Sequence, residues 1–79
     1  MAKVEILNEV TDGEIDNWCL CFQECIYHYD DGTSEDGFRF IWRRPDGSLQ
    51  AARGQARIPD PETLFRLTNL AAQAGWFTI

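Results

Sequence analysis

One short segment of the chain gathers residue types that bind metals or carry thiol chemistry: Cys19, Cys21, Cys25 and His28. On a helix, Cys21, Cys25 and His28 would share one face, which would allow a zinc site or a thiol-redox centre. On a strand, Cys19 and Cys25 would lie about 20 Å apart and would not ligate the same ion. The aromatic and β-favouring residues of this segment favour the strand. We therefore predict no metal and no cofactor, with the thiols packed as small hydrophobes, and keep a zinc or thiol-redox protein as an alternative.

Arginine and tyrosine side chains in the middle of the chain suggest a binding surface. Both residue types are enriched in protein interfaces, and both also stack on bases or hold phosphates in nucleic-acid sites. The predicted partner-binding surface consists of Tyr27, Tyr29, Arg39, Ile41, Arg43, Arg53 and Arg57. Alternatively, these arginines pair with carboxylates of the same molecule, where each exposed pair contributes about 0–1 kcal/mol. The candidate carboxylates are Glu5, Glu9, Glu35 and Asp36.

The charges of the chain are separated between its two halves. Residues 1–37 hold ten acidic residues and one basic residue, whereas residues 38–79 hold six arginines and three acidic residues. The net charge of −6 argues against indiscriminate DNA binding but leaves local binding through the arginines open. We predict a non-enzymatic interaction module that binds a protein partner or forms a homodimer, in which acidic and arginine-rich strands meet across a two-fold axis. The alternative is a nucleic-acid-binding module that uses the same arginines.

The motifs of common catalytic sites do not occur in the sequence. There is no phosphate-binding loop, Rossmann glycine pattern or nucleophile elbow. No serine or cysteine can be placed beside His28 together with a third, orienting group. The acidic loop at residues 30–37 lacks the spacing of a calcium-binding loop and is predicted to be solvated. We conclude from the sequence that the protein is not an enzyme.

Two Asp-Gly turns divide the first part of the chain into strands. Residues 10–14 and 44–48 both suit three-residue hairpin loops that end in a left-handed glycine. With Arg44 opposite Ser48, Trp42 faces Gln50 and Arg39 faces Arg53. In the first hairpin, Val4 is predicted to face Leu20. The predicted strands are residues 3–10, 15–29, 38–44 and 48–58.

The last element is predicted to be a helix over residues 61–74. Asp60 is a favourable N-cap, Pro61 suits the first helical position, and Gly75 suits the left-handed stop. The fold class is therefore α+β: a four-stranded antiparallel β-meander with one C-terminal helix packed on one face (ββββα), in a single domain of residues 1–79. The helix is predicted to cover the even-numbered face of the sheet and to leave the odd-numbered, arginine-bearing face open.

The composition predicts a cytoplasmic protein. No apolar run approaches the ~18 residues of a membrane span, and the N-terminal residues lack the layout of a signal peptide. Three cysteines packed into seven residues do not form a disulfide framework and suit a reducing compartment. We therefore expect no membrane association.

Residues 37–59 resemble short proteobacterial proteins that have no assigned activity. The matching stretch is GFRFIWRRPDGSLQAARGQARIP. This resemblance implies a bacterial protein and no particular functional residue. The hairpin followed by a helix is also similar in outline to DNA-binding domains that lay three strands in the major groove, which would imply the nucleic-acid alternative.

Overall fold

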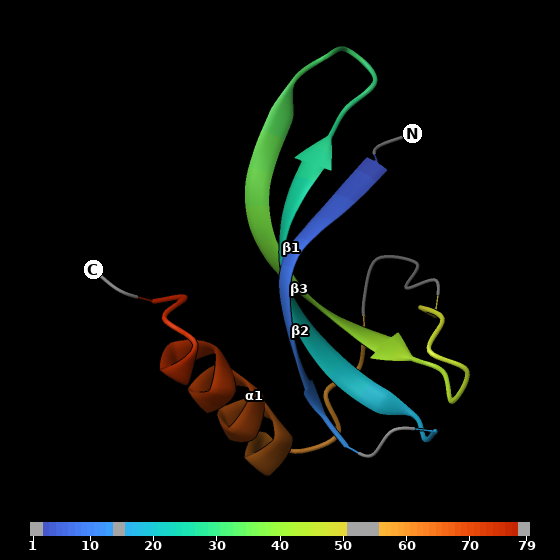
Figure 1. Ribbon diagram of the computed structural model, residues 1–79, viewed down its shortest axis with the longest axis vertical. Coiled ribbons are helices and arrows are strands. Elements are labelled where there is room, and N and C mark those ends of the chain that lie inside the picture. The colour runs from blue at the N-terminus through green and yellow to red at the C-terminus, as the bar shows by residue number, and fades with distance from the viewer. Residues whose placement is uncertain (1–2, 14–15, 51–55, 78–79) are drawn as a thin grey trace.

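The structure is a computed structural model that describes residues 3–13, 16–50 and 56–77 (Figure 1). These described residues form three strands and one helix: β1 (Lys3–Asp12), β2 (Cys19–His28), β3 (Ser34–Arg43) and α1 (Pro61–Gln73). The strands form one antiparallel sheet in the order β1-β2-β3. The class is α+β, and the segment that carries the cysteines is a strand, as predicted.

The prediction of a fourth strand over residues 48–58 is wrong for the part of it that the structure describes. Only Leu49 forms a bridge there, to Arg43, and residues 56–58 are not in a strand. Near its end this segment contacts the sheet without pairing as a strand: the Arg57 backbone carbonyl accepts a hydrogen bond from the Trp42 indole, and Ile58 packs against the core. Over the residues that the structure describes, the sheet therefore has three strands. The predicted pairing of Arg39 with Arg53 lies outside the described residues.

The second hairpin turn has the predicted geometry. The Arg44 amide donates to the Ser48 carbonyl at 2.8 Å, and the Gly47 amide donates to the Arg44 carbonyl at 2.8 Å. Gly47 is left-handed, with φ of 89°, which closes the loop after a type I turn. The Gln50 amide reaches the Trp42 carbonyl, so the predicted alignment holds as far as Gln50.

The first hairpin differs from the prediction. β1 continues to Asp12, which pairs with Leu20, while Val4 pairs with Tyr27 instead of Leu20. The strands are joined by a longer connection, in which Asp16 has a left-handed φ of 74°. The register also shifts between Ile6 and Asn8. This bulge places one extra residue on β1. Even-numbered residues before it therefore lie on the opposite face of the sheet from even-numbered residues after it.

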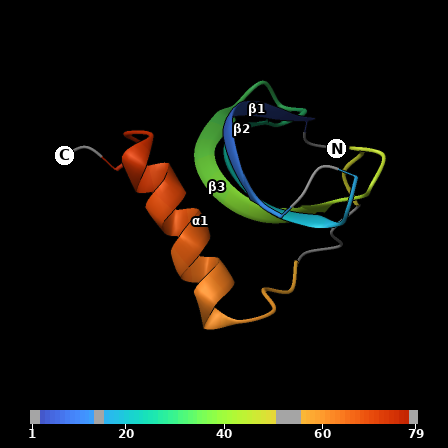
Figure 2. The same cartoon turned by 60° about the horizontal axis from the view of Figure 1, so that its bottom comes forward.

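The sheet is strongly curved, and α1 lies on its convex side (Figure 2). Leu20 and Phe22 of β2 pack there against Leu67 and Ala71 of α1 to form the core. These are even-numbered positions of β2, so the helix covers the predicted face. The expectation that the odd-numbered face is open is wrong for its centre. Cys19, Cys21, Gln23, Cys25 and Ile41 lie on this concave face, and all five are buried.

The helix begins and ends as the sequence predicts. The Asp60 side chain caps it by accepting the Thr63 amide at 2.7 Å, and Gly75 follows it with φ of 89°. Arg66 makes two bonds to Asp12, at 2.8 and 2.9 Å, which tie α1 to β1. Among the residues that the structure describes, no helix is long and apolar enough to cross a bilayer.

Candidate functional site

A hydrogen-bonded network crosses the concave face of the sheet. Gln23, at the centre of β2, is fully buried. Its amide donates to Glu9 of β1, and its carbonyl oxygen accepts from Nε of Arg39 on β3 at 2.7 Å. Arg43 donates to Glu9 through Nη2 at 2.7 Å and through Nε at 3.0 Å, and its Nη1 donates to the Gly47 carbonyl at 2.6 Å. The network therefore joins all three strands and the second turn.

The electrostatics of this network keep Glu9 ionised. Burial raises the pKa of Glu9, but hydrogen bonds from Arg43 and Gln23 outweigh burial, so the pKa lies below its ordinary value. The same pairing raises the pKa of Arg43. Arg39 and Arg43, two of the predicted partner-binding arginines, thus form hydrogen bonds within the molecule. This agrees with the alternative that the arginines pair with carboxylates of the same chain, among which Glu9 was named. The chemistry of this site is an ion pair between Glu9 and Arg43 that stabilises the sheet.

The other predicted binding residues are distributed over several environments. Tyr27 is half-buried on the concave face and lies against Gly37, where an added Cβ would come within 3.1 Å of the tyrosine ring. Tyr29 follows β2, is exposed, and donates to Glu35 at 3.3 Å. Ile41 is buried. Arg57 is exposed and lines a cleft beside Trp42, and Arg53 lies outside the described residues.

The thiols and the histidine do not come together. Cys21 and Cys25 face the concave side, whereas His28 occupies an even-numbered position of β2, where its Nε2 lies 2.9 Å from Oε1 of Glu5. Within the described ranges no three side chains of the metal-binding types form a cluster. Burial, together with the negative charge of Glu9, raises the pKa of Cys21 to about 11. Burial also raises the pKa of Cys25, so neither thiol is a ready nucleophile.

Alkylation of Cys21 is expected to be strongly suppressed in the folded protein. At pH 8, a thiol with a pKa near 11 holds about 100-fold less thiolate than one with its ordinary value of 9.0, and only the thiolate reacts. Iodoacetamide labelling of native and guanidinium-unfolded protein, read peptide by peptide by mass spectrometry, measures this ratio. Equal labelling rates for Cys21 in the two states would contradict the burial described here.

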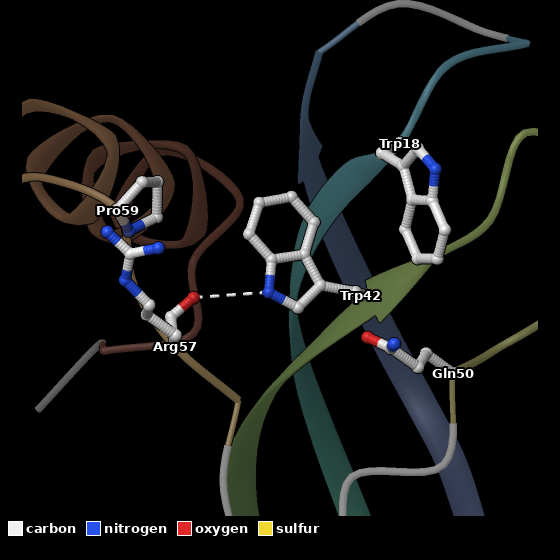
Figure 3. A pocket seen from close by; sticks show the side chains of 5 residues that line it. All are labelled: Trp18, Trp42, Gln50, Arg57 and Pro59. Atoms are coloured by element: carbon white, nitrogen blue, oxygen red, sulfur yellow. Dashed lines mark hydrogen bonds between the residues drawn. The ribbon is translucent and has the colours of Figure 1, made fainter.

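A cleft of about 320 Å³ opens on the convex side of the sheet near the second turn. It is lined by Trp18, Trp42, Gln50, Arg57 and Pro59. In the view of Figure 3, the Trp42 ring lies between Trp18 on one side and Arg57 with Pro59 on the other. The indole nitrogen of Trp42 donates to the Arg57 carbonyl at 3.1 Å, and Trp18 is 50% exposed. The cleft therefore presents apolar indole surface beside one cation.

A second group of aromatic rings lies on the same convex side, near the end of α1. Phe22, Phe38, Phe40, Trp76 and Phe77 make mutual ring contacts with centroids 4.6 to 6.4 Å apart. We call this group the aromatic patch. Its outer members Phe38 and Phe77 are 50% and 45% exposed. Over the described residues, the backbone of α1 comes close to β1 and β2 but not to β3, although the side chains of Phe40 and Trp42 on β3 reach the core.

Sequence reasoning missed both the cleft and the aromatic patch. The even-numbered aromatic residues Phe38, Phe40 and Trp42 were expected to lie beneath the helix as core. The sequence already indicated that one helix leaves part of the sheet uncovered. A helix of 13 residues that packs on two strands cannot also cover a row of large rings along the whole of a third strand.

The fold and these surfaces define a small α+β domain with an incompletely covered sheet. Comparison of the chain with protein-family models, with curated proteins and with solved structures gives no match.

Proposed function

We propose that the protein is a non-enzymatic interaction module that associates with a second copy of itself through the aromatic patch. The observation that carries this proposal is the exposure of Phe38 and Phe77, at 50% and 45%, within a cluster of rings. Contiguous exposed apolar surface on a small protein marks interaction sites, and aromatic residues are enriched in interfaces. Covering these rings would complete the apolar layer that α1 leaves unfinished over β3.

The chain exposes more surface than a compact monomer of its mass. The chain exposes 5815 Å² for a mass of 9.1 kDa, whereas a compact monomer of that mass exposes roughly 4900 Å². The radius of gyration of 13.1 Å likewise exceeds the ~11.6 Å expected for a compact domain of this length.

The charge distribution along β3 favours a second copy as the partner. At the convex-facing positions, the N-terminal end of this strand carries Asp36, and the C-terminal end is followed by Arg44. When two copies meet across a two-fold axis with their β3 strands antiparallel, the acidic end of one strand faces the arginine end of the other. A two-fold contact repeats each such pairing twice.

The buried groups support a role without catalysis. Cys21 and Cys25 are buried with raised pKa values, which removes them as thiolate nucleophiles. Glu9 and Arg43 are paired with one another. Glu9, Arg39 and Arg43 on the concave face are thus engaged in bonds that hold the three strands together.

The proposal predicts a dimer whose formation depends on Phe38. Light scattering over a concentration series from about 1 to 500 µM should show the mass rise toward twice 9.1 kDa in this range, since specific interfaces form there or below. Phe38→Glu should weaken dimerisation by at least ~30-fold, because it places a carboxylate in an apolar contact on both copies.

Leu7→Glu is the matched control. Leu7 is 45% exposed on β1, so the same type of change is made at a similar exposure on another strand, and dimerisation should not change. A wild-type protein that stays monomeric at 500 µM would overturn the second copy as partner. Equal effects of the two substitutions would remove the aromatic patch as the interface.

A further inference from the structure

We infer that the cleft between Trp18, Trp42 and Arg57 binds an acidic, proline-rich segment of another protein, held in the polyproline II conformation. This inference rests on the cleft alone and does not depend on dimerisation through the aromatic patch. Phe38 and Trp42 are four residues apart on β3, which corresponds to about 13 Å. The two surfaces are therefore separate along the strand and can be tested separately.

The indoles of the cleft come from two different segments, and that of Trp42 is held in place by its contacts. Trp42 belongs to β3, packs against the core, and is fixed by its bond to the Arg57 carbonyl at 3.1 Å. Trp18 lies immediately before β2 and is 50% exposed. The cavity of about 320 Å³ is at the small end of the range for ligand pockets. It suits one or two compact side chains of a longer ligand.

Proline fits this lining better than a flexible apolar side chain. Its rigid ring packs flat on an indole, and a polyproline II segment is already extended before it binds, so little conformational entropy is lost. Such a segment also makes no hydrogen bonds of its own, which leaves its carbonyls free to accept. The exposed amide of Gln50 at the cleft supplies a donor for them.

Arg57 favours a ligand that carries an acidic residue next to its prolines. Arg43 and Arg66 are paired with Glu9 and Asp12, whereas within the described parts of the chain Arg57 has no carboxylate within ion-pair distance. Arg57 lines the cleft and gives it a local positive charge, although the net charge of the whole molecule is −6. A ligand carboxylate beside the prolines would meet a cation there.

The test is a titration of the full-length protein with two synthetic peptides. One is acetyl-PPDPPPDPP-amide, and the other has both aspartates replaced by asparagine. Neither peptide contains tryptophan, so the intrinsic fluorescence comes from the three tryptophans of the protein, two of which line the cleft. Calorimetry gives the affinity. The acidic peptide is expected to saturate with a Kd of about 10–100 µM, and the asparagine peptide at least about 5-fold more weakly.

Two substitutions assign the binding to this cleft. Trp18→Ala should weaken binding of both peptides by about 10-fold or more. Arg57→Gln should remove the preference for the acidic peptide and leave the affinity for the asparagine peptide unchanged. Phe38→Glu, made in the aromatic patch, should alter neither affinity, which separates this test from that of dimerisation. Circular dichroism of each variant and of the wild type checks that the fold is retained. We expect it to be retained, because Trp18 is 50% exposed and Arg57 is exposed.

Three outcomes would overturn the inference. The first is the absence of a saturable signal up to about 5 mM peptide, beyond the millimolar Kd of a weak complex. The second is equal binding of a glycine-rich peptide with the same two aspartates, since proline would then contribute nothing. The third is saturation by adenosine monophosphate with the same dependence on Trp18 and Arg57, which would assign the cleft to planar anions in place of peptides.

Discussion

Leu67→Ala is expected to destabilise the fold by about 2–5 kcal/mol, as large-to-small changes at fully buried positions do. Leu67 is fully buried at the centre of the contact between α1 and the sheet. A domain of 79 residues has a total stability of only about 4–12 kcal/mol. The midpoint of thermal unfolding, followed by far-UV circular dichroism, should therefore fall by roughly 10 °C or more.

Leu64→Ala on the same helix is the control for this prediction. Leu64 is 38% exposed, and the identical change there should cost less than about 1 kcal/mol, because little apolar contact is lost. Urea unfolding of the two variants measures the difference directly. Equal losses of stability would show that α1 does not pack on the sheet through the face described here.

Glu9→Ala is expected to cost about 2–3 kcal/mol, because it leaves two donors without their acceptor. Glu9 accepts from Gln23 and Arg43, and the side chains of Glu9 and Arg43 are only 21% and 30% exposed. The double variant Glu9→Ala with Arg43→Ala should lose less than the sum of the two single changes, because the unpaired guanidinium is then absent. Urea unfolding of the four proteins measures this coupling, and strictly additive losses would contradict it.

The same residue gives the protein a defined acid sensitivity. The folded-state pKa of Glu9 lies below its ordinary value of 4.5. A depressed pKa means that the stabilising contribution is fully present above that ordinary value and is lost as the pH falls through the folded-state pKa. Wild type should therefore lose stability more steeply below about pH 4.5 than Glu9→Ala does, so the two unfolding free energies should converge as the pH decreases.

The parts of the fold that local chemistry determines could be predicted from the sequence. The cap at Asp60 and the stop at Gly75 depend on residues within one helical turn, and both are as predicted. The turn at residues 44–48 is equally local, because Asp46 accepts from the Ser48 amide and Gly47 takes the left-handed conformation. In each case, the residues that determine the geometry are adjacent in the chain.

The parts that depend on distant contacts could not be predicted in the same way. The first Asp-Gly pair has the same local signal as the second, but β1 and β2 align by burying Val10 beside Phe22. β2 is buried on both faces, so the alternation of apolar and polar residues that normally fixes register is missing. The sequence pattern alone therefore gave the wrong partner for Val4.

The binding residues follow the same division. The arginines were recognised as an unusual group, but the sequence does not show which of them have carboxylate partners. Arg43 meets Glu9 across 34 positions of sequence, and this contact forms only after β1 and β3 have both joined β2. Arg57 remains exposed at the cleft because it follows the sheet, where the chain turns toward α1.

The bulge between Ile6 and Asn8 separates the length of β1 from its apolar pattern. With Leu7 as the extra residue, Ile6 and Val4 pair with Cys25 and Tyr27 on the concave side, whereas an unbroken two-residue repeat through Leu7 would place them on the convex side. Deleting Leu7 would join Ile6 directly to Asn8 and leave both pairs unchanged. Loss of a residue at this point of the strand is therefore compatible with the architecture without substitutions nearby.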